Sequence, residues 1–415
     1  MEANLFNAFT VLIVLTALFS ILNKKVIKLP STIGVMLIAL VVSLVMIVLS
    51  KIYPATVQPV CKAVEELDFP ELLMEVMLSF LIFAGAFHTN TRLLTREGRA
   101  VLIFATLGVL ISTFVVGGLT YLILPFIGLK ISFVHCLLFG ALISPTDPIA
   151  VLAILKASHV PKSLETDIAG ESLLNDGVAV VVFITILNIA EKGIGQVAPT
   201  DVMILFVKEA IGGGIWGFVL GWIGFQLMKI AQDDKIDVLI TLAMVMGGYL
   251  SSEMMHISGP LAVVMAGLVM SAKVQNNALG QEVTKHVNIF WENVDEVLNA
   301  VLFLLIGAEI INVFREVNSS YIIAGILAIA IVLIARAVSV ALPLPLTSLR
   351  KHSPSKSMAI LIWGGLRGGI SVALALSLKD AMSKDLIVTM TYIVVVFSII
   401  VQGLTIGKLV QRLKL

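Results

Sequence analysis

Two short stretches, SPTDP at residues 144–148 and GGLRGG at residues 364–369, interrupt apolar segments that are long enough to form membrane helices. Pro145 and Pro148 lack the backbone N–H that a helix needs, so no regular helix can run through the first stretch. In the second stretch, four glycines surround Arg367. Each stretch therefore predicts a helix that is broken near its middle and carries a charged residue at the break.

The composition around these breaks is that of an integral membrane protein. Of 415 residues, 59% are apolar and 13% are charged, whereas soluble globular chains carry about 25% charged residues. Apolar runs that can cross a hydrocarbon core about 30 Å thick recur along the whole chain. Because no water is available there, each run must satisfy its own backbone hydrogen bonds. The sequence predicts an all-α polytopic protein, and a net charge of +1 gives no reason to expect a nucleic acid partner.

Thirteen transmembrane helices are predicted, and the distribution of basic residues gives their direction. Eighteen lysines and arginines fall on the side that includes the C-terminus, eight on the other, and only Arg336 and Arg367 fall inside predicted helices. Since basic loops stay in the cytoplasm, we expect a cell-membrane protein with its N-terminus outside and its C-terminus in the cytoplasm. The helices are expected near residues 5–23, 30–50, 71–88, 100–127, 132–156, 165–190, 203–230, 236–253, 258–273, 292–315, 321–345, 355–378 and 385–410.

The two broken helices are the fifth and the twelfth, which stand seven helices apart. Helices 1–6 and 8–13 are therefore predicted to be two six-helix repeats of opposite topology, joined by helix 7. Interrupted helices at matching places in two inverted halves are typical of secondary transporters, in which they form an ion site near the middle of the bilayer.

The chemistry of the first break suits a cation. Asp147 followed by Pro148 is typical of an N-cap with proline in the first helical position, which would open the second half-helix. Carbonyl groups released by the break, together with the hydroxyl of Thr146, offer the oxygen ligands that hard cations prefer. Asp147 and Thr146 are therefore candidate ion ligands.

The sixth predicted helix contains the polar motif GESLLNDG at residues 170–177. Ser172 and Asp176 are four residues apart and share a helix face, whereas Glu171 is turned about 140° from Asp176 at 3.6 residues per turn. We expect Asp176 to face the ion and Glu171 to address another helix. Arg336 is the preferred partner of Glu171 in a structural ion pair, because an unpaired buried charge would be very costly. Arg367 is an alternative partner for either acid.

Asp176 has the properties of a proton carrier. Desolvation favours the protonated form of a carboxylate, whereas a nearby cation favours the ionised form. A buried aspartate subject to both effects can hold a proton when no cation is present and release it when one binds. Glu309, by contrast, is expected at the membrane interface, near the outer end of the tenth helix.

Taken together, the motifs at residues 144–148, 170–177 and 365–369 closely resemble the monovalent cation:proton antiporter family of sodium/proton exchangers, over essentially the full chain. The resemblance implies a homodimer, a sodium site formed by Asp176, Asp147, Ser172 and Thr146, and Asn175 as a further ion-binding residue. Some relatives carry a glutamate in the third helix near the ion path. This chain has Phe83-Ala84-Gly85-Ala86 there, so a third acidic ligand is not expected from this stretch.

The same resemblance implies a division into moving and static parts. Residues 1–99 and 236–315 would form scaffold and dimerisation helices, residues 100–190 and 316–415 a core that moves vertically, and residues 191–235 the linking helix. The dipeptide Asn175-Asp176, instead of two consecutive aspartates, resembles the branch with electroneutral exchange.

Three alternatives remain at this stage. Lithium or potassium could replace sodium, because the ligand chemistry is the same. A cation channel would also carry acids in its pore. An intramembrane aspartyl protease would use two buried aspartates, but the chain has neither a Gly-x-Gly-Asp nor a His-Glu-x-x-His motif. We therefore expect a transporter that is not an enzyme and that needs no cofactor beyond the transported sodium or lithium ions and protons.

Overall fold

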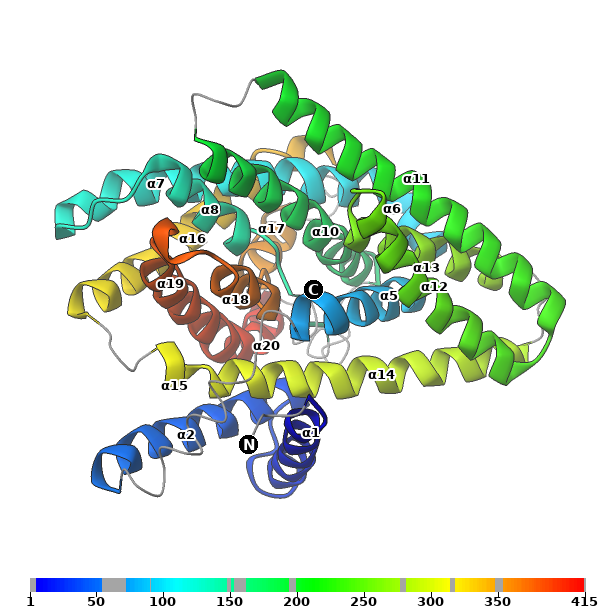
Figure 1. Ribbon diagram of the computed structural model, residues 1–415, viewed down its shortest axis with the longest axis horizontal. Coiled ribbons are helices and arrows are strands. Elements are labelled where there is room, and N and C mark those ends of the chain that lie inside the picture. Colours follow the sequence, from blue (N-terminus) through cyan, green and yellow to red (C-terminus); the bar gives the residue numbers. More distant parts are fainter. Residues whose placement is uncertain are drawn as a thin grey trace.

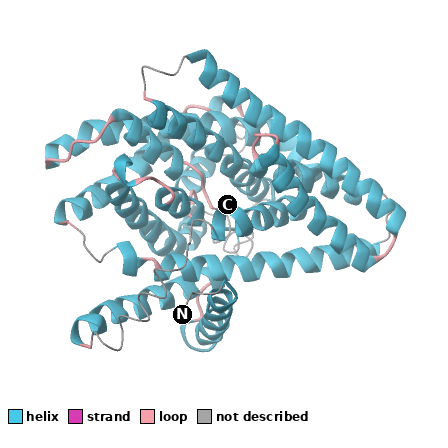
Figure 2. Ribbon diagram, viewed as in Figure 1, coloured by secondary structure: helices cyan, strands magenta, loops and turns pink. Residues whose placement is uncertain are grey.

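The computed structural model describes residues 5–53, 72–89, 91–147, 151–152, 162–193, 199–276, 281–313, 318–347 and 354–413. Within these ranges the chain is helical, with short turns and breaks and without strands (Figure 2). Eight of the described helical segments are long and apolar enough to cross a membrane, and three shorter apolar helices accompany them. The prediction of an all-α polytopic fold is confirmed.

Described helices are found in each of the thirteen predicted segments. In the first half they are α1 (Leu5–Leu22) with η1 (Asn23–Ile27), α2 (Ser31–Ile52), η2 (Leu72–Met77) with α5 (Leu78–His88), α6 (Thr91–Ile103) with η3 (Phe104–Gly108), α7 (Val109–Ile123) and η4 (Leu124–Ile127), α8 (Phe133–Ile143), and α10 (Lys162–Lys192).

The second half begins after the linking helix α11 (Pro199–Ala231). It consists of α12 (Asp234–Met254), α13 (Gly259–Asn276), α14 (Gln281–Ala308) with α15 (Ile310–Val313), α16 (Ser319–Ala341) with η5 (Leu344–Leu346), α17 (Pro354–Trp363), α18 (Gly369–Leu376), η7 (Asp380–Met382), and α19 (Lys384–Phe397) with η8 (Ser398–Gln402) and α20 (Gly403–Leu413). The sequence of a long helix, a broken helix and a long helix thus occurs once in each half, as the inverted-repeat prediction requires.

The largest boundary difference concerns α14, which was expected near residues 292–315 and instead spans Gln281–Ala308. Its first turns are polar, so hydropathy alone does not include them. They continue the helix because one face packs inward, where Val287 and Trp291 are fully buried and the Trp291 indole donates a hydrogen bond of 3.0 Å to Thr241 on α12. Tertiary packing here extends a helix beyond its apolar part.

The two breaks lie where the sequence places them. The fifth segment is helical to Ile143, is non-helical over residues 144–147, and is helical again at residues 151–152. In the twelfth segment α17 ends at Trp363 and α18 begins at Gly369. The predicted N-cap at Asp147 with Pro148 in the first helical position lies partly outside the described residues, because Pro148 is not among them.

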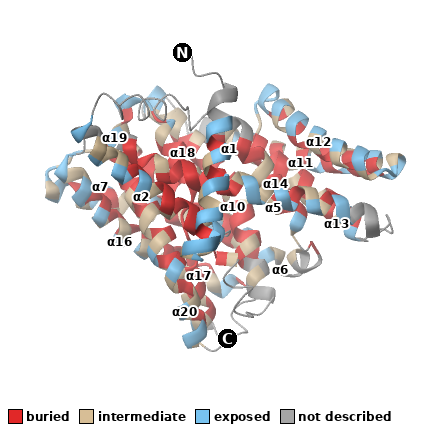
Figure 3. Ribbon diagram, turned by 90° about the horizontal axis from the view of Figure 1, so that it is seen from below, coloured by how far each residue is buried: buried red, intermediate tan, exposed pale blue. Residues whose placement is uncertain are grey.

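The buried core lies where the two sets of broken and long helices meet. α18 and α19 pack together, α10 packs on α8, and α7 packs on both α8 and α16. In Figure 3 buried residues concentrate in this central region, whereas α11 and α12 expose much of their length. α14 lies along one side of the core with α2 and α1 against it (Figure 1).

Exposed apolar side chains cover the outer helices. On α11 they include Met203, Ile204, Ile215 and Trp222, which face away from the core. An apolar surface of this extent is expected for helices that contact lipid. On its inner side α11 approaches α13 closely, since a Cβ atom at Gly221 would lie 2.7 Å from the Ala266 carbonyl oxygen. Small residues of this kind allow membrane helices to pack backbone to backbone.

Candidate ion-binding site

The two breaks are joined to each other by their backbones. The Asp147 N–H donates a hydrogen bond of 2.8 Å to the Leu366 carbonyl oxygen. Both residues lie in non-helical segments, where backbone groups have no partner within their own helix. The bond therefore fixes the position of Asp147 relative to the second break, although the two residues are far apart in the sequence.

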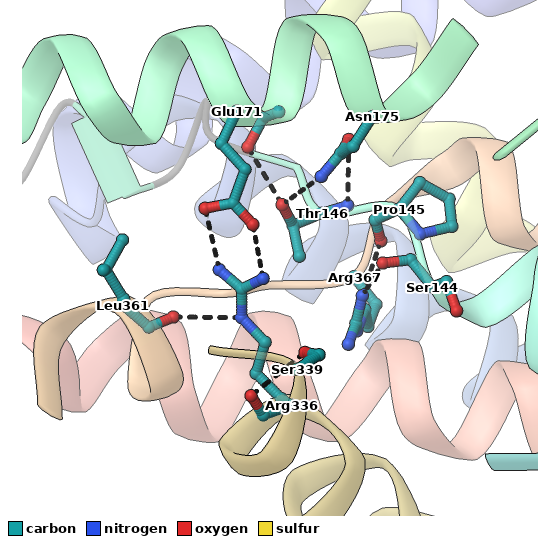
Figure 4. A network of polar contacts seen from close by, with 10 residues as sticks. Ser144, Pro145, Thr146, Glu171, Asn175, Arg336, Ser339, Leu361 and Arg367 are labelled. Carbon is teal, nitrogen blue, oxygen red and sulfur yellow. Dashed lines mark hydrogen bonds and ion pairs between the residues drawn. The ribbon is translucent and has the colours of Figure 1, made fainter. Parts of the chain in front are cut away.

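Arg367 strengthens the same connection. Its Nη1 group donates to the Ser144 carbonyl oxygen and, at 2.9 Å, to that of Pro145 (Figure 4). Its own backbone N–H donates to the Ser398 hydroxyl at 2.9 Å. Carbonyl groups at the C-terminal end of a helix carry partial negative charge. Because α8 ends at this break, its last carbonyl groups have no partner within a helix and can accept hydrogen bonds from the positively charged guanidinium of Arg367. Among the described contacts Arg367 forms no ion pair with an acid, and its side chain contacts the backbone of the first break.

Glu171 and Arg336 lie against each other, which is the pairing preferred from the sequence. Nη1 and Nη2 of Arg336 donate to the two carboxylate oxygens of Glu171 at 2.5 and 3.1 Å, and Nε donates to the Leu361 carbonyl oxygen at 3.1 Å (Figure 4). Both side chains are buried. The forked geometry satisfies most of the polar atoms of both groups, which is the condition under which a buried ion pair is tolerated.

A network of neutral groups holds the first break against α10. The Thr146 hydroxyl lies 3.0 Å from the Ser172 hydroxyl and accepts a hydrogen bond of 2.8 Å from Nδ2 of Asn175. The Thr146 backbone N–H also points to Oδ1 of Asn175 at 3.4 Å. All three side chains are buried. Asn175, the residue before Asp176, therefore connects the break to α10 through hydrogen bonds without adding a charge.

The two predicted acidic ligands open onto one cavity of about 590 Å³. Asp147 and Asp176 line it together with Thr146 and Ser172, and both aspartates are half-buried. Asp176 and Ser172 share the cavity face of α10, whereas Glu171 faces α16, as the helical spacing predicts. The structure thus brings together two carboxylates and two hydroxyls around a single space.

Gly368 explains how Asp147 fits there. A Cβ atom at Gly368 would lie 2.5 Å from Oδ2 of Asp147 and 2.7 Å from its Cβ. Gly368 is also the N-cap residue of α18. Only a residue without a side chain lets the carboxylate lie beside the positive end of this half-helix, where a negative charge is stabilised.

The structure also shows polar residues that sequence reasoning missed or misplaced. Asp295 and Asn299 of α14 line the same cavity, and Glu292 lies one turn before them. Their sequence signal was an acid and an amide four residues apart at the edge of an apolar run. Glu309 was expected at the membrane interface but is 6% exposed, since it follows directly on α14 and is covered by the core. Gly85, from the stretch Phe83–Ala86, lines the cavity as well.

Two carboxylates and two hydroxyls that line one cavity, beside a pair of broken helices, define a secondary active transporter for cations. The chain matches the family "Sodium/hydrogen exchanger, transmembrane" over residues 12–412, and it belongs to this family of transporters. It is therefore not an enzyme.

Curated relatives of similar length carry consistent names. The chain is 45% identical to the Na(+)/H(+) antiporter NhaP of Pseudomonas aeruginosa over 412 residues, which cover 97% of this chain and 95% of the relative. It is 34% identical to the Na(+)/H(+) antiporter NhaH of Halobacillus dabanensis, with 94% and 93% of the two chains covered. The fold is similar to that of the sodium proton antiporter MjNhaP1 from Methanocaldococcus jannaschii, with a TM-score of 0.75, 19% identity and coverage of 100% and 99%.

Proposed function

We propose that this protein exchanges sodium ions for protons across a cell membrane by alternating access to Asp147 and Asp176. The observation that carries the proposal is that both carboxylates line one cavity with the hydroxyls of Thr146 and Ser172. Sodium is a hard cation that prefers such oxygen ligands. The names of the relatives favour sodium over potassium. Lithium has the same ligand chemistry and is expected to be carried as well.

Competition at Asp176 would couple the two ions. A proton and a sodium ion both neutralise this carboxylate, and each favours release of the other. Asp147, held by the backbone bond to Leu366 and beside the start of α18, would stay ionised as a fixed sodium ligand. Glu171 is occupied by Arg336 and would stay structural.

Competition at Asp176 also implies a stoichiometry. With Asp147 ionised throughout, the carboxylate pair has the same net charge when it holds one proton as when it holds one sodium ion. Asn175, which occupies the position next to Asp176, hydrogen-bonds to Thr146 and cannot add a titrating group. We therefore propose exchange of one sodium ion for one proton, without net movement of charge.

We expect the cavity to open toward the cytoplasm. Its lining includes Thr89 at the end of α5, Glu165 near the start of α10 and Glu292 of α14. The distribution of basic residues favours a cytoplasmic position for all three helix ends. The N-terminus would then lie outside, the C-terminus in the cytoplasm, and the described conformation would be open to the inside.

Alternating access would follow from movement of one part of the chain. The bonds between the two breaks, from Asp147 to Leu366 and from Arg367 to Pro145, tie residues 100–190 to residues 316–415. These two segments would move together against a scaffold of residues 1–99 and 236–315, with residues 191–235 linking the halves. The scaffold would also form the interface of a homodimer.

Flux measurements with purified protein in liposomes test the proposal. An inside-acid liposome with a trapped pH dye, clamped by potassium and valinomycin at several voltages, receives sodium, lithium or choline outside. Proton efflux that requires sodium or lithium and is independent of voltage supports one-for-one exchange. Voltage-dependent exchange would contradict the stoichiometry only. Sodium flux without coupled proton movement would contradict the exchanger and indicate a channel.

A further inference from the structure

The cavity-facing side of α14 is polar although this helix lies outside the paired breaks. Asp295 and Asn299 both line the cavity, one turn apart on the same face. Nδ2 of Asn299 donates a hydrogen bond of 3.0 Å to Oδ1 of Asp295. This bond orients the amide so that its carbonyl oxygen points away from the carboxylate.

Among the described residues, none forms a hydrogen bond with the side-chain carbonyl oxygen of Asn299. Asn299 is only 1% exposed, and its Oδ1 atom has no hydrogen-bond partner among the described residues. A buried acceptor without a partner is destabilising, and natural proteins rarely keep one without a functional reason. Rotating the amide would satisfy neither group, because it would set Oδ1 against the Asp295 carboxylate. The unpaired oxygen is therefore a candidate ligand.

The distance between this pair and the main site can be followed along α14. Leu302, one turn beyond Asn299, also lines the cavity and lies against Gly369, since a Cβ atom at Gly369 would lie 2.9 Å from Cγ of Leu302. Gly368, the preceding residue, lies beside Asp147, since a Cβ atom there would be 2.5 Å from Oδ2 of Asp147. At 1.5 Å per residue, Asp295 lies about 10 Å along the helix axis from Leu302. Asn299 thus lies one turn and Asp295 two turns from the level of the Asp147 break, toward the end of the cavity that Glu292 lines.

Other groups near the pair do not compete for this role. Both ring nitrogens of His88, on α5, lie against carbonyl oxygens, those of Ala84 at 2.8 Å and of Asn288 at 3.1 Å. His88 is thus engaged by the backbone. Glu292 also lines the cavity one turn before Asp295, but it is exposed. The less exposed oxygen ligands here are those of Asp295 and Asn299, and water can complete the shell of a small hard cation.

We propose that Asp295 and Asn299 form a second, weaker binding position for a monovalent cation, which the transported ion occupies on its way to Asp147 and Asp176. The assignment of the transported ion rests on the proposed function. A carboxylate and an amide oxygen together supply one negative charge and two types of oxygen ligand. Such a position would hold the ion long enough to raise its local concentration, but it would release the ion easily. No sodium is expected to be exchanged for a proton there.

The kinetic test compares four variants in proteoliposomes. Asp295→Asn and Asn299→Ala each remove one ligand, Asn299→Asp keeps an oxygen at the same place, and Glu296→Gln removes a neighbouring charge that is exposed and does not line the cavity. We expect Asp295→Asn and Asn299→Ala to raise the sodium KM about three- to tenfold with little change in kcat. Asn299→Asp should keep the sodium KM near the wild-type value or lower it. Glu296→Gln should leave KM unchanged.

A binding measurement separates this position from the main site. Sodium-22 binding is measured in detergent on Asp176→Asn, alone and combined with Asp295→Asn or Glu296→Gln. Weak binding that survives Asp176→Asn and Glu296→Gln but disappears with Asp295→Asn supports the second position.

Two results would overturn it. If Asp295→Asn raises the sodium KM while Asn299→Ala matches the wild type, Asp295 acts only by long-range electrostatic attraction and the two residues do not form a binding position. If neither variant differs from Glu296→Gln in flux and binding, the pair is structural. Absence of sodium-driven proton flux in the wild type would instead contradict the proposed function, and the binding data would still decide the second position.

Discussion

The Asp147 N–H and the Leu366 carbonyl oxygen form a hydrogen bond of 2.8 Å that joins the two broken helices of the inverted repeats. One partner belongs to a candidate ion ligand, and the other lies next to Arg367, whose side chain binds the opposite break in return. Two reciprocal contacts between the breaks make them a single structural unit. The carboxylate of Asp147 is therefore positioned by the second repeat as much as by its own.

Asp176→Asn is expected to abolish sodium/proton exchange without loss of expression or fold. The amide keeps the size and an oxygen ligand, but it cannot carry a proton at the position where sodium and protons compete. Proton flux in liposomes should fall to the level of protein-free vesicles. Glu253→Gln, which removes an exposed charge on α12, is the matched control. Wild-type exchange by Asp176→Asn would show that another group carries the proton.

Gly368→Ala should weaken sodium binding while the fold is kept. The added Cβ atom would lie 2.5 Å from Oδ2 of Asp147, so the carboxylate must move. Displacement of a reacting group by about 1 Å can cost up to about 100-fold, and we expect the sodium KM to rise about 10- to 100-fold. At Gly247 on α12 a Cβ atom would meet nothing within 4 Å, so Gly247→Ala should exchange like the wild type. Equal KM values for the two variants would contradict the assigned position of Asp147.

Arg336→Ala should act on stability more than on ion affinity. It leaves the Glu171 carboxylate buried without its partner, and breaking a buried ion pair in this way typically costs about 3–5 kcal/mol. Heat-induced unfolding in detergent should begin at a clearly lower temperature. Adding Glu171→Ala removes the stranded charge and should recover part of the loss. If the double variant is no more stable than Arg336→Ala, the pair does not contribute as described.

Sodium itself should stabilise the protein against heat, and more strongly at alkaline than at acidic pH. A ligand that binds only the folded state adds about 2.7 kcal/mol at 100 times its dissociation constant. At acidic pH protons occupy the same carboxylate, so sodium binds less well and its stabilising effect shrinks. Unfolding temperatures with sodium and with choline, at matched ionic strength across pH, measure this difference. A sodium effect that does not change with pH would argue against competition.

Much of the fold follows from simple properties of the sequence. Apolar runs predicted the helices, and two prolines and four glycines marked the breaks at residues 144–148 and 364–369. The exact extent of α14 could not be predicted, because its polar first turns become helical only through the packing of Val287 and Trp291. Packing of this kind depends on residues far away in the chain.

The site was predictable to the extent that its charges lie at unusual places. An acid or arginine in an apolar segment needs a partner or a cavity, which pointed to Asp147, Asp176 and the Glu171–Arg336 pair. The role of Arg367 was not accessible, because its partners are backbone carbonyls that only the break exposes. Asn299 is an ordinary polar residue in sequence, and only its buried, unpaired oxygen distinguishes it.

Proton release on sodium binding tests the central claim most directly. Purified protein in weakly buffered detergent solution is titrated with sodium while a pH dye records the protons released, across a range of starting pH values. Competition at Asp176 predicts release that approaches one proton per bound sodium ion at acidic pH, falls toward zero at alkaline pH, and is lost in Asp176→Asn. Sodium binding without proton release at every pH, or undiminished release by Asp176→Asn, would contradict the account.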